Sequence, residues 1–439
     1  MPNNHYAHVK SVLALCFFLS ACAPRQQTSI SATPTISSTA EVTATISPTV
    51  EATTTISQAM PENEKIKDIF FSPCLTINPA PPNGNQIPWL LLVRRAAVYT
   101  IDPNSGLKSD QRIPPPDPNS NRPFAYDFSL SPDGKWLTYI LYGENDDSLV
   151  VEPSDNLLTN SSQDRVVWTS NQYFNLEGWL NNENIMLVMN HTLENFGTTL
   201  AYNPFTGEQH EFSLEEMPKS LKQQYGMSGS YLMDQGNLIP DPTLTRIVYP
   251  LDLDLEGMQL ALWDVEKKKI LAHINYAPFD QWSRSPFWSQ DGSDFLVVGR
   301  TEKQTIEWFQ VTKDGLIHQL TYFGEFLSDA NFNLPSRSWD GRYLAFQLPY
   351  NQNEQGTYDD SKYFFLDLKS QSLDGFCINY GDKSLPDKPV VWSPDSHYVV
   401  ITHGTIGERS AEVILVDLEK RKAFRIATDV EAIGWMVKP

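Results

Sequence analysis

Acidic and aromatic residues gather in the segments between the expected strands, and their types have the clearest capacity for chemistry. We single out six of these residues: Asp146, Asp147, Asp254, Glu256, Tyr358 and Asp360. Carboxylates beside aromatic rings suit a cationic or peptide ligand, because they combine negative charge with flat apolar surface. Two carboxylates from distant loops could also act together on a glycosidic bond. A set of merely solvated loops is the simpler interpretation of the same residues.

Other kinds of site are disfavoured by residue spacing. The stretch from Gly226 to Ser230 does not match the G-x-S-x-G elbow of a serine hydrolase. The stretch from Asp252 to Gly257 begins like a calcium loop, but its twelfth position is Trp263 instead of Glu. The eight histidines show no paired spacing typical of zinc sites. We expect no metal site, no cofactor and no catalytic residue of a hydrolase domain.

The N-terminal segment combines a basic residue, a short apolar run and a cysteine. Lys10 precedes the apolar residues 12–19, a run too short to span a bilayer as a helix. The run ends in Leu19-Ser20-Ala21-Cys22, which resembles the bacterial lipobox. This resemblance implies that residues 1–21 are a signal peptide and that Cys22 becomes an acylated N-terminus. Acyl chains contribute about 0.8 kcal/mol per buried CH₂, so several chains would hold the protein on a membrane.

The remaining cysteines raise the question of a disulfide. Removal of Cys16 with the signal peptide and acylation of Cys22 leave Cys74 and Cys377 as an even pair in an oxidising compartment. A disulfide and two free thiols are equally compatible with the sequence. Only closeness in the fold can decide, because two distant cysteines cannot be bridged.

Composition separates a linker from a folded domain and restricts the partners. Residues 22–60 are dominated by Thr, Ser, Ala, Val and Pro, which lack the apolar mass to offset chain entropy. We therefore expect a disordered tether at 22–60 and a folded domain at 61–439. The formal net charge is −20 at pH 7, which argues against nucleic acid as a partner, because such binding relies on Lys and Arg that neutralise phosphates.

A repeated pattern of strands must position the candidate residues. The first apolar residue after a polar turn recurs at intervals of 47 to 62 residues, which suits one four-stranded propeller blade per interval. These residues are Trp89, Trp136, Ile185, Ile247, Phe295, Tyr343 and Tyr398. The longest interval contains Ser213-Leu214-Glu215-Glu216, whose capping-box spacing predicts a short helical insertion there.

The turns that precede these strands share a composition. Four are clear: Ser131-Pro132-Asp133-Gly134, Ser289-Gln290-Asp291-Gly292, Ser338-Trp339-Asp340-Gly341 and Ser393-Pro394-Asp395-Ser396. Pro presets φ for a turn, Asp bonds to nearby backbone, and Gly adopts positive φ. A Ser-Pro-Asp-Gly-Lys turn leading into such a strand resembles the repeat of TolB-type propellers, which also occurs in dipeptidyl-peptidase and prolyl-oligopeptidase enzymes. The resemblance covers residues 87–439 and implies the fold, but it is nearly silent on function.

The C-terminal strand at residues 433–437 is expected to complete the first unit and to close the ring, which removes exposed sheet edges. Residues 70–73 are the alternative source of that strand. The sequence therefore predicts an all-β, seven-bladed β-propeller preceded by a signal peptide and a tether.

For function, we expect a lipid-anchored, extracytoplasmic binding or scaffolding protein of the bacterial cell envelope. Its partner, besides the membrane, would be an envelope protein, a peptide or a glycan. The alternative is a hydrolase or lyase that acts on a polysaccharide through carboxylates at the mouth of the propeller.

Overall fold

The computed structural model describes most of the chain after residue 62. The described residues are 63–79, 87–94, 97–106, 108–110, 125–142, 146–159, 165–170, 172–189, 198–212, 238–252, 259–277, 287–325, 327, 332–352, 358–380, 388–404 and 411–436. The chain divides into two compact units, Met1–Glu51 and Ala52–Pro439, and all described residues belong to the second. The expected signal peptide, Cys22, the expected tether and the helical insertion expected at residue 213 all lie outside the described residues.

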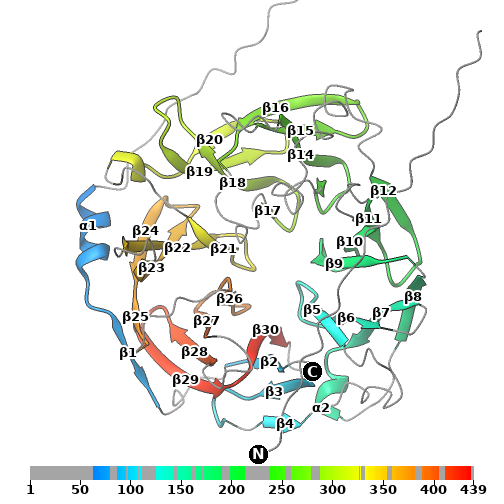
Figure 1. Cartoon of the computed structure of the whole chain (residues 1–439), viewed down its shortest axis with the longest axis horizontal. Helices are drawn as coiled ribbons and strands as arrows, with labels where there is room; N and C mark the ends of the chain where they lie inside the picture. The colour runs from blue at the N-terminus through cyan, green and yellow to red at the C-terminus, as the bar shows by residue number, and fades with distance from the viewer. Residues whose placement is uncertain are drawn as a thin grey trace, which may run out of the picture. The chain divides into compact units, whose positions relative to one another are not determined.

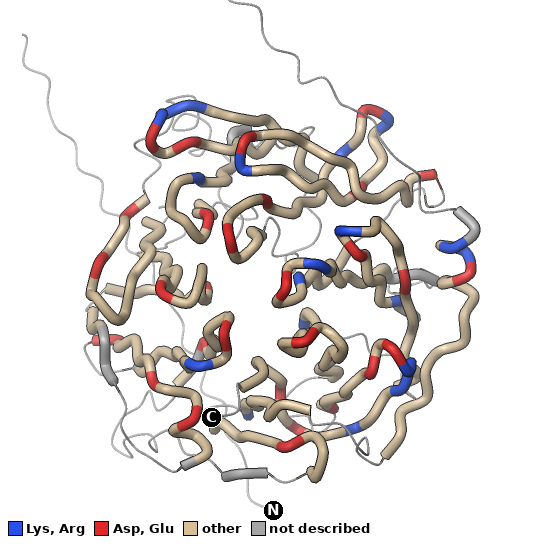
Figure 2. The backbone as a smooth tube through the Cα atoms, turned by 180° about the vertical axis from the view of Figure 1, so that it is seen from behind, with Lys and Arg blue, Asp and Glu red and all other residues tan. Residues whose placement is uncertain are grey.

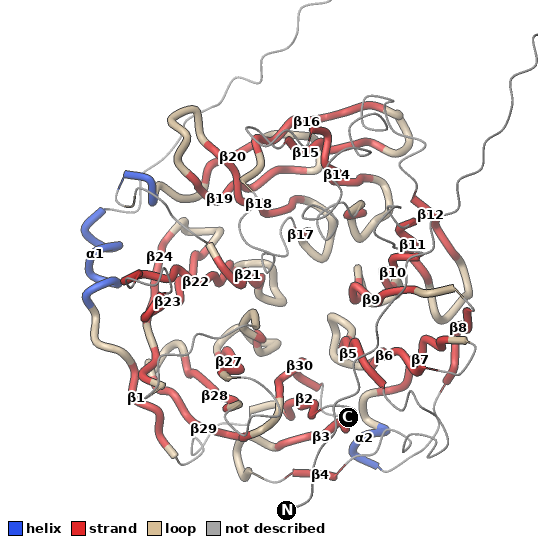
Figure 3. Tube along the Cα trace, viewed as in Figure 1, coloured by secondary structure: helices blue, strands red, loops and turns tan. Residues whose placement is uncertain are grey.

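Within this unit, the described strands form seven sheets that follow one another around a ring (Figures 1 and 3). Six of the sheets have the expected four strands, whereas the seventh has six. Sheet 1 consists of β30 (Glu431–Met436), β2 (Trp89–Arg94), β3 (Ala97–Ile101) and β4 (Lys108–Asp110). Sheet 2 consists of β5 (Ala125–Leu130), β6 (Trp136–Tyr142), β7 (Asp147–Pro153) and β8 (Arg165–Ser170). Sheet 3 consists of β9 (Phe174–Trp179), β10 (Ile185–Met189), β11 (Thr198–Tyr202) and β12 (Gln209–Phe212).

The later sheets repeat this up-and-down order. Sheet 4 consists of β13 (Ile239–Pro240), β14 (Arg246–Asp252), β15 (Gln259–Asp264) and β16 (Lys269–Asn275). Sheet 5 consists of β17 (Phe287–Trp288), β18 (Asp294–Arg300), β19 (Ile306–Thr312) and β20 (Ile317–Gln319). Sheet 6 consists of β21 (Asn333–Arg337), β22 (Tyr343–Gln352), β23 (Tyr358–Asp367) and β24 (Ser372–Phe376). Sheet 7 consists of β26 (Val391–Trp392), β27 (Tyr398–His403), β28 (Glu412–Asp417), β29 (Lys422–Thr428), β1 (Leu75–Asn78) and β25 (Ile378–Asn379).

In the described part of the chain, the strands are accompanied by three short helices: α1 (Asn63–Phe71), α2 (Asn156–Thr159) and the 3-10 helix η3 (Phe323–Glu325). Among the described residues, no helix has the length and apolar character that crossing a bilayer would require.

The chain end closes the ring as the sequence predicts. β30 pairs antiparallel with β2, with Trp89 opposite Met436 and Leu90 opposite Trp435. Strand β30 therefore completes the sheet that β2, β3 and β4 begin, and it covers the edge of β2 that would otherwise be unpaired. The alternative, in which residues 70–73 supply this strand, is wrong, because Phe70 and Phe71 end helix α1.

A tryptophan on the innermost strand links several sheets to their neighbours. Trp435 is fully buried, and its Nε1 donates to the carbonyl of Val391 in sheet 7 at 3.3 Å. Trp392 Nε1 donates to Ser336 O in sheet 6 at 3.4 Å, and Trp288 Nε1 donates to a carbonyl of sheet 4. Each ring fills the space between two sheets while its polar atom is satisfied, which suits an indole at such an interface.

Candidate functional site

The six residues predicted to lie in ligand-facing loops occupy different positions in the structure. Asp146 is exposed, but Asp147 is only 8% exposed, because it already begins β7 opposite Tyr142. Asp254 and Glu256 lie outside the described residues.

Tyr358 and Asp360 fall inside a strand. β22 and β23 form a hairpin of ten residues each, and it pairs the backbones of these residues with Gln352 and Tyr350. The expected loop between these strands is therefore shorter than the sequence suggests. Of the six, Asp146 is the residue that the structure places exposed in a loop.

The repeated polar turns are closed by a fixed set of hydrogen bonds. Ser338 Oγ donates to Asp340 Oδ1 at 2.6 Å and accepts from the backbone N–H of Tyr343 at 2.8 Å. The N–H of Arg342 donates to the same carboxylate oxygen at 3.1 Å. The same three bonds occur in the turns that begin at Ser131, Ser289 and Ser393. The serine and the aspartate of the repeat thus hold the turn at the start of the second strand.

Hydrogen bonding also sets the ionisation of these carboxyl groups. The backbone and hydroxyl of Ser293, followed by the hydroxyl of Ser289, lower the pKa of Asp291. Burial raises the pKa of Asp133 and of Asp340, but hydrogen bonds from the turn outweigh it and leave each pKa lowered. A general acid needs a raised pKa, so these aspartates serve as ionised acceptors.

Neighbouring turns are joined to one another around the ring. The N–H of Asp133 donates to Asn182 Oδ1 at 2.9 Å, and Ser396 Oγ donates to Asp340 Oδ1 at 3.1 Å. Arg337 of sheet 6 pairs with Asp294 of sheet 5 at 2.6 Å. Figure 2 shows acidic and basic residues spread around the whole ring. The charges of this turn network connect adjacent sheets and act as structural links.

Glu307 is a buried carboxyl group with another structural role. It is 1% exposed and accepts hydrogen bonds from Thr321 Oγ1 and from the N–H groups of Phe323 and Gly324, at 2.7 to 2.8 Å. Burial raises the pKa of Glu307, and the hydrogen bonds act in the opposite direction. The carboxyl group fixes the 3-10 turn η3 and is closed to a substrate. Among the described residues, no group of three or more His, Cys, Asp and Glu side chains could hold a metal ion.

A segment at the start of the domain, residues 63–78, crosses the outer edge of the ring, and we call it the strap. Its helix α1 buries Ile66 and Ile69 in the core cluster of sheets 5 and 6, and Phe70 packs on Phe364 with ring centroids 5.4 Å apart. Its strand β1 runs parallel to β25 on one side and to β29 on the other. The strap therefore joins the end of sheet 6 to sheet 7, which explains the six strands of sheet 7 (Figure 1).

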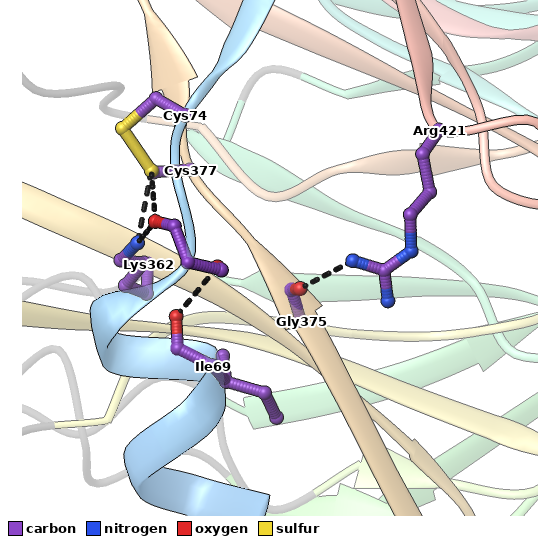
Figure 4. Close-up of a disulfide and its surroundings, with 7 residues drawn as sticks. Ile69, Cys74, Lys362, Gly375, Cys377 and Arg421 are labelled. Atoms are coloured by element: carbon purple, nitrogen blue, oxygen red, sulfur yellow. Dashed lines mark hydrogen bonds between the residues drawn. A yellow bond between two sulfur atoms is a disulfide. The ribbon is translucent and has the colours of Figure 1, made fainter.

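A disulfide fixes the strap to the ring. Cys74 and Cys377 are bonded, with an S–S distance of 2.01 Å and a Cα–Cα distance of 4.5 Å (Figure 4). The N–H of Leu75 donates to Cys377 O at 2.8 Å, which holds the two segments together beside the bond. The fold therefore decides the question that the sequence leaves open.

Lys362 lies beside this disulfide and is a functional candidate that sequence reasoning missed. It is 1% exposed on β23, and its Nζ donates to Ser72 O at 2.7 Å and to Cys377 Sγ at 3.0 Å (Figure 4). Buried lysines are rare unless they are paired. No signal in the sequence separates it from a surface lysine, because its environment comes from a strap nearly three hundred residues earlier in the chain.

Known proteins resemble this chain in fold. A scan against family models and a search of curated proteins give no match. Similar solved structures include TolB from Acinetobacter baumannii, at 12% identity over 81% of this chain and 88% of that chain, with a TM-score of 0.40. The β-propeller domain of the Trilobed protease from Pyrococcus furiosus has 12% identity over 81% and 97%, with a TM-score of 0.46. An oligogalacturonate lyase in complex with manganese has 13% identity over 79% and 86%, with a TM-score of 0.47. The sheets arranged in a ring make the described part of the chain a β-propeller, and TolB proteins are among the solved structures that it resembles.

Proposed function

We propose that this protein is a lipid-anchored, extracytoplasmic β-propeller that binds or scaffolds a partner in the bacterial cell envelope. In this proposal residues 1–21 are a signal peptide, Cys22 is acylated, and residues 22–60 are the tether of a seven-bladed propeller. The observation that carries the proposal is the strap. The segment that follows the proposed tether is bound to sheets 6 and 7 by a disulfide and by β pairing. A lipid anchor before this segment would therefore be firmly attached to the propeller.

The partner would be an envelope protein, a peptide or a glycan, received on the face that carries the loops between second and third strands. Asp146 lies in such a loop and is exposed, whereas the carboxylates of the turns are engaged in holding adjacent sheets together. Nonrepeating loops are where propeller-like scaffolds differ from one another, so recognition belongs there and not in the turns.

The test of the anchor compares two cysteine variants of the full chain. Cys22→Ser removes the acylated sulfur and is expected to move the protein from the membrane fraction to the soluble fraction. Cys16→Ser is the matched control, because it changes the same segment and leaves the lipobox complete. If the Cys22→Ser protein remained in the membrane fraction to the same extent as the Cys16→Ser protein, the proposed anchor would be refuted. Capture of the partner from envelope extract by the Cys22→Ser protein then tests the binding role.

The competing proposal is a hydrolase or lyase that acts on a polysaccharide. Such an enzyme would pair a carboxyl group of raised pKa with a second carboxylate in an accessible place. Among the described carboxyl groups with a resolved shift, Glu307 is the one whose pKa is raised, and it is buried beneath η3. Binding is therefore the better supported function, and release of reducing or unsaturated sugar ends from envelope glycans by the purified protein would favour the enzyme instead.

A further inference from the structure

The two sulfurs of the strap disulfide lie in very different surroundings. Cys74 is an exposed residue on the strap, between the end of α1 at Phe71 and the start of β1 at Leu75. Cys377 is 2% exposed between β24 and β25, and Lys362 Nζ donates to its Sγ at 3.0 Å (Figure 4). The disulfide thus joins an exposed cysteine to a buried cysteine whose sulfur lies beside the amino group of Lys362.

This asymmetry has a chemical consequence for thiol–disulfide exchange. A thiolate attacks one sulfur and expels the other, and the reaction is faster when the expelled sulfur is a stable thiolate. A neighbouring lysine favours the thiolate form of a cysteine. Attack is therefore favoured at Cys74, because this residue is the exposed one of the pair and because the sulfur then expelled is the one beside Lys362.

The position of Lys362 is itself fixed by the strap. Its Nζ also donates to the backbone carbonyl of Ser72 at 2.7 Å, two residues before Cys74. This bond links the position of the Lys362 amino group beside Cys377 to the docked strap.

We propose that Cys74 and Cys377 form a directional thiol–disulfide exchange site for a dithiol oxidoreductase of the same compartment. Cys74 is the sulfur that forms the mixed disulfide with the partner. Cys377 is the leaving sulfur in reduction and the resolving nucleophile in oxidation, with Lys362 as its positioning residue. This inference rests on the strap geometry and does not depend on acylation of Cys22.

Bonds, electrons and protons balance in both the reduction and the oxidation of the disulfide. In reduction, a thiolate of the partner attacks Cys74 Sγ, the Cys74–Cys377 bond breaks, and its electron pair becomes the thiolate of Cys377 beside Lys362. The second thiol of the partner loses its proton and attacks the partner's own sulfur in the mixed disulfide. Cys74 leaves as a thiolate and takes up that proton, so that two electrons pass from the dithiol to the strap. In oxidation, the thiolate of Cys74 attacks the disulfide of an oxidised partner and expels one of its two sulfurs as a thiolate. Cys377 thiolate then attacks Cys74 Sγ in this mixed disulfide and expels the other sulfur, so that two electrons pass to the partner.

The first experiment locates the mixed disulfide in the full-length protein. The oxidised protein is exposed briefly to reduced glutathione and quenched with acid, and free thiols are alkylated before peptide mapping. Glutathione is expected on Cys74 and the alkyl group on Cys377. Glutathione predominantly on Cys377 would overturn the proposal, and this experiment needs no substitution that could disturb folding.

The second experiment measures the role of the lysine. Lys362→Met is expected to slow reduction of the disulfide by glutathione about 5- to 10-fold, because the leaving thiolate loses a charge-assisted hydrogen bond. Lys369→Met, which changes an exposed lysine just after the same strand, should react at the wild-type rate. Circular dichroism confirms that each variant is folded before its rate is compared. Equal rates for folded Lys362→Met and Lys369→Met would refute the role of Lys362.

Discussion

Removal of the strap disulfide gives a quantitative test of how the start of the domain is held. The change is Cys74→Ala together with Cys377→Ala, which deletes the bond between residues separated by 303 positions. In the chain-entropy description, a loop of that length restricts the unfolded chain by about 5 to 6 kcal/mol at 25 °C. Measured losses fall below this description, at about 2 to 5 kcal/mol, since unfolded chains retain structure.

The contacts of the strap indicate that the loss in the free energy of unfolding falls in the range of about 2 to 5 kcal/mol. The strap keeps its noncovalent contacts in the variant, because Ile66 and Ile69 remain buried and β1 still has partners on both sides. The folded state should therefore stay intact, and the loss should come from the greater freedom of the unfolded chain. We expect the free energy of unfolding to fall by about 2 to 5 kcal/mol.

The assay is urea unfolding at pH 7, followed by tryptophan fluorescence, for the wild type and the double variant. Unfolding the wild type with excess dithiothreitol is the matched control, because reduction should shift its midpoint toward that of the variant. Equal midpoints for the oxidised wild type and the double variant would refute the view that this bond secures the domain.

Three further predictions concern closure, the strap and pH. Trp435→Ala should lower the free energy of unfolding, measured in urea, by about 3 to 5 kcal/mol, because loss of the fully buried indole leaves a cavity beside β30. A loss below about 1 kcal/mol would contradict the role of β30 in closing the ring of sheets. Gly375→Ala should lower the free energy of unfolding by about 1 to 3 kcal/mol, because the added Cβ would lie 2.6 Å from Tyr363 O and 2.7 Å from Ile69 Cγ2. The amide protons of α1 should then exchange faster with solvent, and unchanged protection of α1 would contradict this prediction. Burial raises the pKa of Asp367, but hydrogen bonds led by the one from Arg342 lower it to about 2, so its contribution to stability is complete above about pH 4 and is lost as the pH falls toward 2. Arg342→Met should flatten this acid limb in thermal unfolding scans from pH 5 to 2, and an unchanged limb would contradict that assignment.

The repeated strands could be read from the sequence because their signals are local. Trp89, Trp136, Ile185, Tyr343 and Tyr398 each begin a strand, as the alignment of the turns predicts. The reason is the turn chemistry, in which a serine hydroxyl and an aspartate carboxylate bond to backbone at fixed spacing and so set the start of the next strand.

The strap could not be predicted because its partners are distant in the chain. Residues 63–71 contain no repeat signal, and the helix forms where Ile66 and Ile69 find the core of sheets 5 and 6. The partnership of Cys74 with Cys377, and the place of Lys362 beside them, depend on β1 pairing with strands from the end of the chain. Contacts of this range leave no local pattern.

The loop residues show a second limit of sequence reasoning. The sequence pattern places Asp147 in a loop between two expected strands, but Asp147 begins β7 and is nearly buried. Strand ends are the least certain part of a pattern-based prediction, and a shift of one or two residues changes a ligand-facing group into a structural one.

Mass spectrometry of the mature protein extracted from membranes tests the lipid anchor and the disulfide of the strap together. We expect an N-terminal peptide that begins at Cys22 and carries acyl chains, together with a Cys74–Cys377 linked peptide in the same nonreduced digest. A mature protein that begins elsewhere, or that carries an unmodified Cys22 on the membrane, would contradict the proposed anchor. A nonreduced digest in which Cys74 and Cys377 are both free would contradict the disulfide bond between the strap and the ring.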